Sequence, residues 1–230
     1  MSYGTLAFDI DGVLIDSRLS NRRIVREVSG AEDEDIAWFK GNGGFNCDWE
    51  LARALTVWLA AGRPPLIQVR GWQDVVALAP EHDPGDLAER CDALYRELWT
   101  EEKPLVDSGL LHLLSSEFDL VAVTGRRPWA FERAQELLDF RFARFTTADI
   151  VRKPDPEALL RLLNPASPFC MVMGDTRDDQ LLAHQTRLYT RVPIYYLHVE
   201  EGQSPQNVLE ILHREPDTAE EHARQYCEAG

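Results

Sequence analysis

Short apolar runs alternate with segments of helical periodicity through the second half of the chain. The apolar runs fit buried strands and lie at residues 120–123, 145–147, 169–173 and 193–199. The other segments repeat apolar residues at helical spacing and lie at residues 109–116, 128–138, 155–163, 179–188 and 205–212. Strands that alternate with helices predict right-handed crossovers and a parallel sheet covered on both faces.

A further apolar run, residues 6–8, lies near the N-terminus, and a long helical stretch separates it from the others. Between Ser17 and Lys103 the sequence has no convincing buried strand. Its apolar spacing predicts helices at residues 20–28, 34–40, 48–60, 72–78 and 84–100. The chain therefore predicts an α/β fold in which a helical insertion follows the first strand. Residues 215–230 are polar, and we expect a peripheral helix or a frayed tail there.

Two carboxylates, Asp9 and Asp11, directly follow the first apolar run, and Gly12 then lets the chain turn. In an extended segment alternate side chains share a face, so both carboxylates are expected to point the same way. Two such groups at the mouth of an apolar strand repel each other and are costly to desolvate. A divalent cation offsets that cost, and oxygen ligands suit Mg²⁺. The alternative is a strand that ends in a solvated acidic turn.

Polar groups also follow the other predicted strands. The segment TGR (residues 124–126) follows the second strand, KPD (153–155) lies beyond the third, and GDTRDD (174–179) follows the fourth. Each segment alone is an ordinary turn or helix start. In an open parallel sheet, however, ligands bind beyond the carboxyl ends of the strands. The joint order predicts acids, a hydroxyl and a lysine at one edge of the sheet.

These segments resemble the motifs of the haloacid dehalogenase superfamily of phosphohydrolases. The matching motifs are DIDGVLIDS (residues 9–17), TGR, KPD and GDTRDD. The insertion is similar to the cap of the helical-cap subfamily, which includes phosphoglycolate phosphatases and β-phosphoglucomutases. The resemblance implies a Rossmann-like catalytic core, residues 1–16 and 104–230, and a helical cap, residues 17–103.

The resemblance implies a role for each acidic motif residue. Asp9 would be the nucleophile that attacks phosphorus, and Asp11 would be the general acid and then the base. Magnesium would be held by the carboxylates of Asp9 and Asp175 and by the backbone carbonyl of Asp11. Asp179 and Asp178 would act through bound water.

The remaining motif residues would handle the phosphoryl group. Thr124 and the amide of Gly125 would hold its oxygens, and Lys153 would neutralise charge on it and on the nucleophile. Arg126 is open to two interpretations: contact with a substrate anion, or an exposed arginine at a helix start.

Two groups within the superfamily catalyse other reactions. The dehalogenases that name the superfamily attack carbon without a metal and lack the second aspartate of the first motif, so Asp11 argues against that activity. A relative that cleaves phosphonates would need a cap lysine, and Lys40 keeps that alternative open.

The segment at residues 40–49 joins two predicted cap helices. In helical-cap relatives, the loop at a comparable distance after the nucleophile dips into the active site and sets specificity. Glycines permit close backbone approach, and polar side chains offer hydrogen bonds to a leaving group. The candidate specificity residues are Asn42, Gly43, Gly44 and Asn46. The alternative is a flexible connector with Asn46 or Asp48 as a helix N-cap.

Composition narrows the classes of binding partner and the cellular compartment that we expect. A formal net charge of −15 argues against nucleic acid or an anionic membrane surface as the main partner. The sequence shows no signal peptide and no apolar run of membrane-spanning length. Its four cysteines have no paired spacing. We therefore expect a reducing cytoplasm as the compartment.

The resemblance, together with the motif residues, implies a Mg²⁺-dependent phosphatase that hydrolyses a small phosphomonoester through an aspartyl-phosphate. A phosphomutase or other phosphotransferase acting on a sugar phosphate is the alternative enzyme. A non-catalytic phosphate-binding regulatory protein is the alternative outside catalysis.

Overall fold

The computed structural model describes residues 2–42, 45, 47–66, 70–200 and 203–228. Its internal contacts divide the chain into two compact units, each described by itself below. The first unit is Met1–Asp16 with Lys103–Gly230, and the second is Ser17–Glu102. Among the described residues, no helix is both long and apolar enough to cross a membrane.

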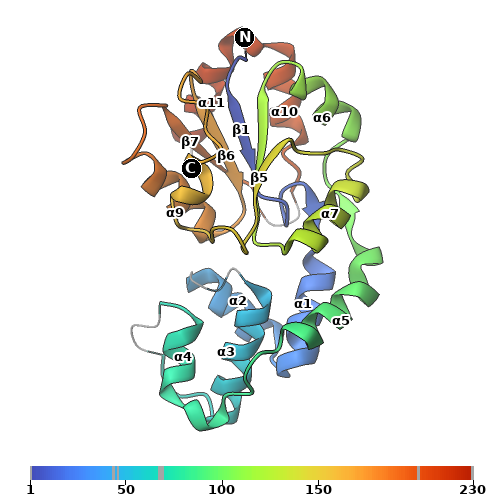
Figure 1. Ribbon diagram of the computed structural model, residues 1–230, viewed down its shortest axis with the longest axis vertical. Helices are drawn as coiled ribbons and strands as arrows, with labels where there is room; N and C mark the ends of the chain where they lie inside the picture. The colour runs from blue at the N-terminus through green and yellow to red at the C-terminus, as the bar shows by residue number, and fades with distance from the viewer. Residues whose placement is uncertain (1, 43–44, 46, 67–69, 201–202, 229–230) are drawn as a thin grey trace. The chain divides into compact units, whose positions relative to one another are not determined.

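The first unit is built on a five-stranded parallel sheet with the order β5-β4-β1-β6-β7 (Figure 1). Its strands are β1 (Thr5–Phe8), β4 (Asp119–Val123), β5 (Arg144–Thr146), β6 (Cys170–Gly174) and β7 (Ile194–His198). The first strand of the chain is the central one. It pairs with β4 on one side and with β6 on the other, and Thr5 lies opposite both Asp119 and Cys170.

Helices cover both faces of this sheet (Figure 1). They are α6 (Ser108–Ser115), α7 (Pro128–Leu137), α8 (Glu157–Leu160), α9 (Arg177–Thr186), α10 (Gln206–Arg214) and α11 (Ala219–Glu228). Alternate residues of β1 enter different hydrophobic clusters: Leu6 and Phe8 pack with α6, α7, α10 and α11, whereas Ala7 packs with α8 and α9. Burial on both faces explains why the strands are continuously apolar.

A second, two-stranded sheet lies where the chain leaves the first unit and returns to it. It joins β2 (Ile15–Asp16) to β3 (Lys103–Pro104) in antiparallel register, with Ile15 opposite Pro104. Strands of two residues carry no detectable period, so the sequence did not predict this pairing.

The second unit is helical. Its helices are α1 (Arg18–Ser29), α2 (Asp33–Asn42), α3 (Asp48–Ala60), α4 (Trp72–Leu78) and α5 (Ala88–Leu98), with the 3₁₀ turns η1 (Pro80–His82) and η2 (Trp99–Glu101). Helix α1 buries Ile24, Val25 and Val28 and packs against α3 and α5. It ends at Gly30, whose φ of 75° is the left-handed conformation that glycine adopts without strain.

The fold class predicted from the sequence is confirmed, and two helices differ in their bounds. Helix α5 begins at Ala88 rather than at residue 84, because Gly85 has a φ of 76° and interrupts the helix. Helix α8 is limited to Glu157–Leu160, shorter than the predicted 155–163.

The polar C-terminal segment forms the short 3₁₀ turn η3 (Pro216–Thr218) and then a helix, α11, that packs on the sheet. It buries Ala219 and Ala223 in the core and contacts β7, where Tyr195 Oη donates to Glu220 Oε1 at 3.1 Å. Because the buried face consists of small alanines at i and i+4, the apolar signal in the sequence is weak.

Candidate active site

The carboxyl end of the parallel sheet gathers the motif residues of the first unit. Asp9 directly follows β1, Thr124 follows β4 and Asp175 follows β6, while Lys153 lies in the segment after β5. The carboxyl ends of parallel strands meet at one edge, which is why four segments far apart in the sequence meet here.

A cluster of three carboxylates and one ammonium group, buried except for the half-buried Asp175, forms the centre of this edge. Lys153 Nζ lies 2.9 Å from Asp9 Oδ2 and 2.6 Å from Asp179 Oδ1. Asp9, Asp175 and Asp179 each offer a carboxylate oxygen, and these three atoms lie within 4.8 Å of one another. The side chains of Lys153, Asp179 and Asp9 are only 1%, 2% and 4% exposed. Charged groups this deeply buried require close counter-charges.

The electrostatics of the cluster favour one more cation. Burial raises the pKa of Asp9 well above its ordinary value, Lys153 opposes this, and the neighbouring Asp179, Asp175 and Asp11 raise it further. Burial alone lowers the pKa of Lys153, but Asp179 and Asp9 outweigh burial and raise it. With every group ionised, three carboxylates and one ammonium leave two negative charges. The oxygen donors and this net charge fit a divalent cation such as Mg²⁺.

Helix α9 fixes Asp179. Thr176, the N-cap residue, accepts a hydrogen bond from the Asp179 backbone through its hydroxyl oxygen at 3.3 Å, and its own N–H donates to Asp179 Oδ2 at 3.1 Å. This reciprocal capping box satisfies donors at the helix start. Asp178, also predicted from the sequence, is buried in the same first turn. Carboxylates are favoured there by the helix dipole.

Two glycines allow the acidic groups to approach the backbone. A Cβ atom at Gly12 would clash with the Asp175 carboxylate, and one at Gly174 would clash with the Asp179 side chain. Gly12 also has a φ of 74°, a conformation that L side chains rarely adopt. Glycine is therefore required at both positions for this arrangement.

Tyr196 is a site residue that sequence reasoning missed. Its hydroxyl donates to the carbonyl oxygen of Gly174 at 3.0 Å and lies 3.3 Å from that of Thr176, on either side of Asp175. In the sequence Tyr196 is one aromatic residue within an apolar strand, and nothing in that pattern marks it. Burial raises its pKa, and the nearby Asp179, Asp175 and Asp9 add to the effect.

Arg126 is buried, so it is not the exposed arginine at a helix start that one of the two interpretations expected. Its residue exposure is 6%, and its guanidinium makes two hydrogen bonds to the Asp11 carboxylate. This contact uses donors of Nε and Nη2, and contact between Arg126 and a substrate anion stays a prediction. Nothing in the sequence indicated this contact, because Arg126 and Asp11 are 115 residues apart in the chain and only the sheet makes β4 and β1 neighbours.

Thr124, predicted to bind a phosphoryl group, is buried and contacts Arg126. Its hydroxyl oxygen accepts a hydrogen bond from the Arg126 N–H at 3.1 Å, and its own N–H donates to the Thr146 carbonyl at 3.0 Å. Gly125 lies between these two anchored residues. The structure therefore brings Thr124, Gly125, Asp9, Asp11, Lys153, Asp175 and Asp179 to one edge of one unit.

The predicted specificity residues of the helical unit are only partly described. Gly43, Gly44 and Asn46 lie outside the described residues. Asn42 is exposed, and its side-chain amide donates to the Trp38 carbonyl at 2.6 Å. Lys40 forms an ion pair with Asp48 at 2.8 Å, within the same unit. The N-cap of α3 is Cys47 rather than Asn46 or Asp48.

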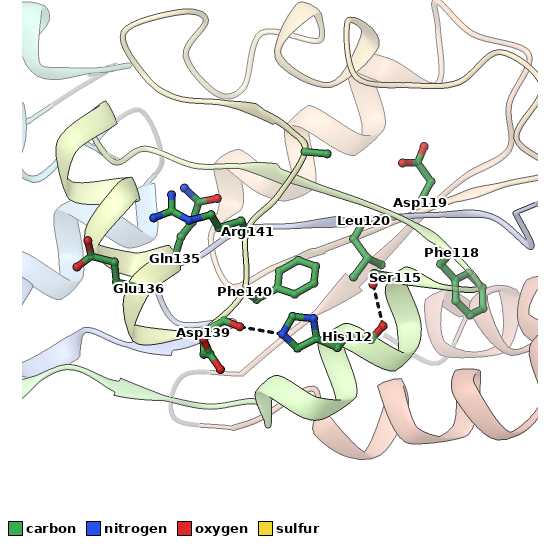
Figure 2. A pocket seen from close by; sticks show the side chains of 11 residues that line it. His112, Ser115, Phe118, Asp119, Leu120, Gln135, Glu136, Asp139, Phe140 and Arg141 are labelled. Carbon is green, nitrogen blue, oxygen red and sulfur yellow. Dashed lines mark hydrogen bonds between the residues drawn. The ribbon is translucent and has the colours of Figure 1, made fainter.

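A separate pocket lies at the opposite end of the sheet. Figure 2 shows His112 beside Phe140, with its ring hydrogen-bonded to the Asp139 carbonyl at 2.9 Å. The pocket is lined by the start of β4 and by residues of α6 and α7. It contains none of the motif residues, so it does not belong to the candidate active site.

Comparison with known proteins places these features in a family. The sequence model of the haloacid dehalogenase-like hydrolases matches residues 3–184. The comparison with curated proteins gives no match.

Several solved structures share the fold. The phosphatase Tt82 from Thermococcus thioreducens is 24% identical, with a TM-score of 0.74, over 91% of this chain and 99% of that one. A Lactobacillus plantarum protein assigned as a phosphoglycolate phosphatase is 21% identical, with a TM-score of 0.54, over 85% and 86% of the two chains. A Thermotoga maritima protein assigned as a β-phosphoglucomutase is 18% identical, with a TM-score of 0.54, over 94% and 99%. At these identities the similarity shows the fold alone.

Proposed function

The chain belongs to the haloacid dehalogenase-like hydrolases, and from that premise we propose that it is a Mg²⁺-dependent phosphatase acting on a small phosphomonoester. The observation that carries the proposal is the buried cluster of Asp9, Lys153, Asp175 and Asp179 at the carboxyl end of the sheet. The family generally uses a divalent metal, and this cluster has the oxygen donors and the charge to bind one.

In the proposed reaction Asp9 is the nucleophile. Its carboxylate attacks phosphorus, the bond from phosphorus to the leaving oxygen breaks, and the carboxyl group of Asp11 gives that oxygen its proton. Asp11 then takes a proton from the water that attacks the aspartyl-phosphate and releases inorganic phosphate. Lys153 offsets charge on Asp9 and on the phosphoryl oxygens, which Thr124 and the Gly125 amide bind by hydrogen bonds.

The metal has a defined place in this proposal. The carboxylates of Asp9 and Asp175 and the backbone carbonyl of Asp11 would hold Mg²⁺, and Asp179 and Asp178 would act through bound water. When bound, Mg²⁺ supplies positive charge to the phosphoryl oxygens and to the nucleophile.

The experiment that tests the proposal is phosphate release from a panel of phosphomonoesters, with Mg²⁺ and with a chelator. We expect release from at least one small ester that requires Mg²⁺. Isomerised sugar phosphate in place of free phosphate would indicate a phosphomutase. Binding of beryllium fluoride or aluminium fluoride, which are analogues of the phosphoryl group, without turnover of any ester would indicate a regulatory protein and contradict the hydrolase.

Substitution of Gly12 by alanine tests the metal site. The new Cβ would displace the Asp175 carboxylate, so we expect Mg²⁺ affinity, measured by titration calorimetry, to fall by about tenfold or more, the scale of other disturbances next to metal ligands.

The matched control for this substitution is Gly30→Ala. Gly30 has nearly the same φ, 75°, but nothing lies within 4 Å of its added Cβ. Both variants should lose about 1–2 kcal/mol of stability from the left-handed backbone, whereas only Gly12→Ala should lose Mg²⁺ affinity. Equal Mg²⁺ affinity in the two variants would contradict the site.

The raised pKa of Asp9 predicts how Mg²⁺ stabilisation depends on pH. Without metal, folding raises this pKa above its ordinary value of 3.8, so the ionised carboxylate destabilises the fold. The penalty appears as the pH rises from the unfolded pKa towards the folded one. Because Mg²⁺ competes with the proton for Asp9, the rise in melting temperature on adding Mg²⁺ should grow with pH over this window. An equal Mg²⁺ shift at all pH values would contradict the role of Asp9 as a ligand.

A further inference from the structure

The Asp11 carboxylate is held by a two-point contact from Arg126. Arg126 Nε donates to Asp11 Oδ2 at 3.0 Å and Nη2 donates to Oδ1 at 2.7 Å. The arginine side chain is 4% exposed and the aspartate side chain 27% exposed. A guanidinium fork that uses two parallel donors fixes both the position and the plane of a carboxylate, which a single point charge does not.

Arg126 is itself anchored on two sides. Its backbone N–H donates to Thr124 Oγ1 at 3.1 Å, and Nη1 donates to the carbonyl of Ala130, in the first turn of α7, at 3.4 Å. The residue therefore joins the end of β1, where Asp11 lies, to the end of β4, where Thr124 lies. An anchored donor can hold its partner more rigidly than a surface arginine, because less rotamer freedom remains to be lost.

We propose that Arg126 is a positioning residue that holds the Asp11 carboxyl group in the place and plane from which it gives its proton to the leaving oxygen. The inference rests on the phosphatase function proposed above. Each carboxylate oxygen has two lone pairs, so Asp11 can accept both hydrogen bonds from Arg126 and still carry the transferred proton on a lone pair directed elsewhere.

The contact with Asp11 favours a positioning role for Arg126 over direct binding of a substrate anion. Nε and Nη2 both point at Asp11, and the side chain is almost fully buried. A residue that positions the acid affects kcat/KM only for esters whose leaving group needs a proton, whereas a residue that binds the substrate anion affects kcat/KM for every ester.

The test uses Arg126→Lys, which keeps the charge but loses the fork. Two substrates are compared: the best alkyl phosphomonoester of the panel, whose leaving group needs a proton, and 2,4-dinitrophenyl phosphate, whose leaving group does not. We expect kcat/KM for the alkyl ester to fall about tenfold or more, within the range of general acid catalysis. The kcat/KM for the dinitrophenyl ester should change by less than about twofold, because kcat/KM reports only the steps up to departure of the leaving group and excludes the later step in which Asp11 acts as the base.

Two further variants serve as a control for loss of an arginine fork and as a test of whether Arg126 acts through Asp11. Arg53→Lys removes a similar fork, since Arg53 Nε and Nη2 both donate to Asp83 within the helical unit, and it should leave both substrates unaffected. In an Asp11→Asn background, Arg126→Lys should cause no additional loss on the alkyl ester, because the two residues act as one unit. Asp11→Asn itself should still bind Mg²⁺, since only its backbone carbonyl serves the metal.

Several results would overturn the inference while leaving the phosphatase proposal intact. These are an equal loss of kcat/KM on both esters, or an additive loss of kcat/KM for the alkyl ester in the Asp11→Asn background. A wild-type protein that releases no phosphate would instead overturn the phosphatase proposal. Independently of activity, a crystal structure of Arg126→Lys should show the Asp11 carboxyl group displaced, and an unmoved group would contradict the inference. If that variant does not fold, Arg126→Gln, which keeps a planar donor, replaces it in every measurement.

Discussion

Asp9→Asn is expected to abolish Mg²⁺-dependent phosphate release, with a loss of roughly 10⁴-fold or more, the scale seen when a nucleophile is removed. An asparagine amide is not nucleophilic, so no aspartyl-phosphate forms. The substitution is nearly isosteric, and its side-chain oxygen can still accept the hydrogen bond that Ile10 N–H gives to Asp9 Oδ1 at 2.7 Å. The measurement is initial-rate phosphate release from the best substrate of the panel.

Stability measurements separate a chemical loss from a folding defect. Because burial raises the pKa of Asp9, a neutral amide avoids the cost of a buried charge, and the metal-free variant should melt no lower than the wild type. Asp217→Asn is the matched control, since Asp217 is exposed in η3, and it should retain full activity. Phosphate release by Asp9→Asn above a few per cent of the wild-type rate would contradict the assignment of the nucleophile.

Lys153→Met should destabilise the metal-free protein and impair catalysis together. The ammonium contacts Asp9 and Asp179, and its loss leaves these two buried carboxylates close to each other and to the half-buried Asp175. Removing one partner from a buried ion pair costs about 3–5 kcal/mol, which corresponds to a fall of roughly 10 °C in melting temperature for a unit of this size. Loss of charge compensation at the phosphoryl group should lower kcat by about 10²- to 10³-fold.

The response to Mg²⁺ identifies the cause of this instability. A divalent cation replaces part of the missing positive charge, so Mg²⁺ should raise the melting temperature of Lys153→Met more than that of the wild type. The control is Lys103→Met, because Lys103 is exposed in β3 and its loss should change neither stability nor activity. An unchanged melting temperature for metal-free Lys153→Met would contradict the buried cluster.

Much of the fold could be predicted from the sequence because its signals are periodic. Strands buried on both faces are continuously apolar, and the helices between them repeat at helical spacing, so the alternation alone indicates a parallel sheet. The same alternation places the segments after β1, β4, β5 and β6 at one edge, whatever the order of the strands. Segments whose buried faces are small or very short, such as α11 and the pair β2–β3, lack this signal.

The chain by itself determined which chemistry-bearing residues lie at the carboxyl edge: Asp9 and Asp11 after the first strand, and Thr124, Lys153 and Asp175 in the later segments. Which side chains touch one another was decided only by the tertiary structure. The strand order β5-β4-β1-β6-β7 puts β1 beside both β4 and β6, so Arg126 meets Asp11 and Gly12 lies against Asp175. Spacing along a chain fixes the end of the sheet at which a residue lies, but contact and burial depend on which strands are neighbours in space.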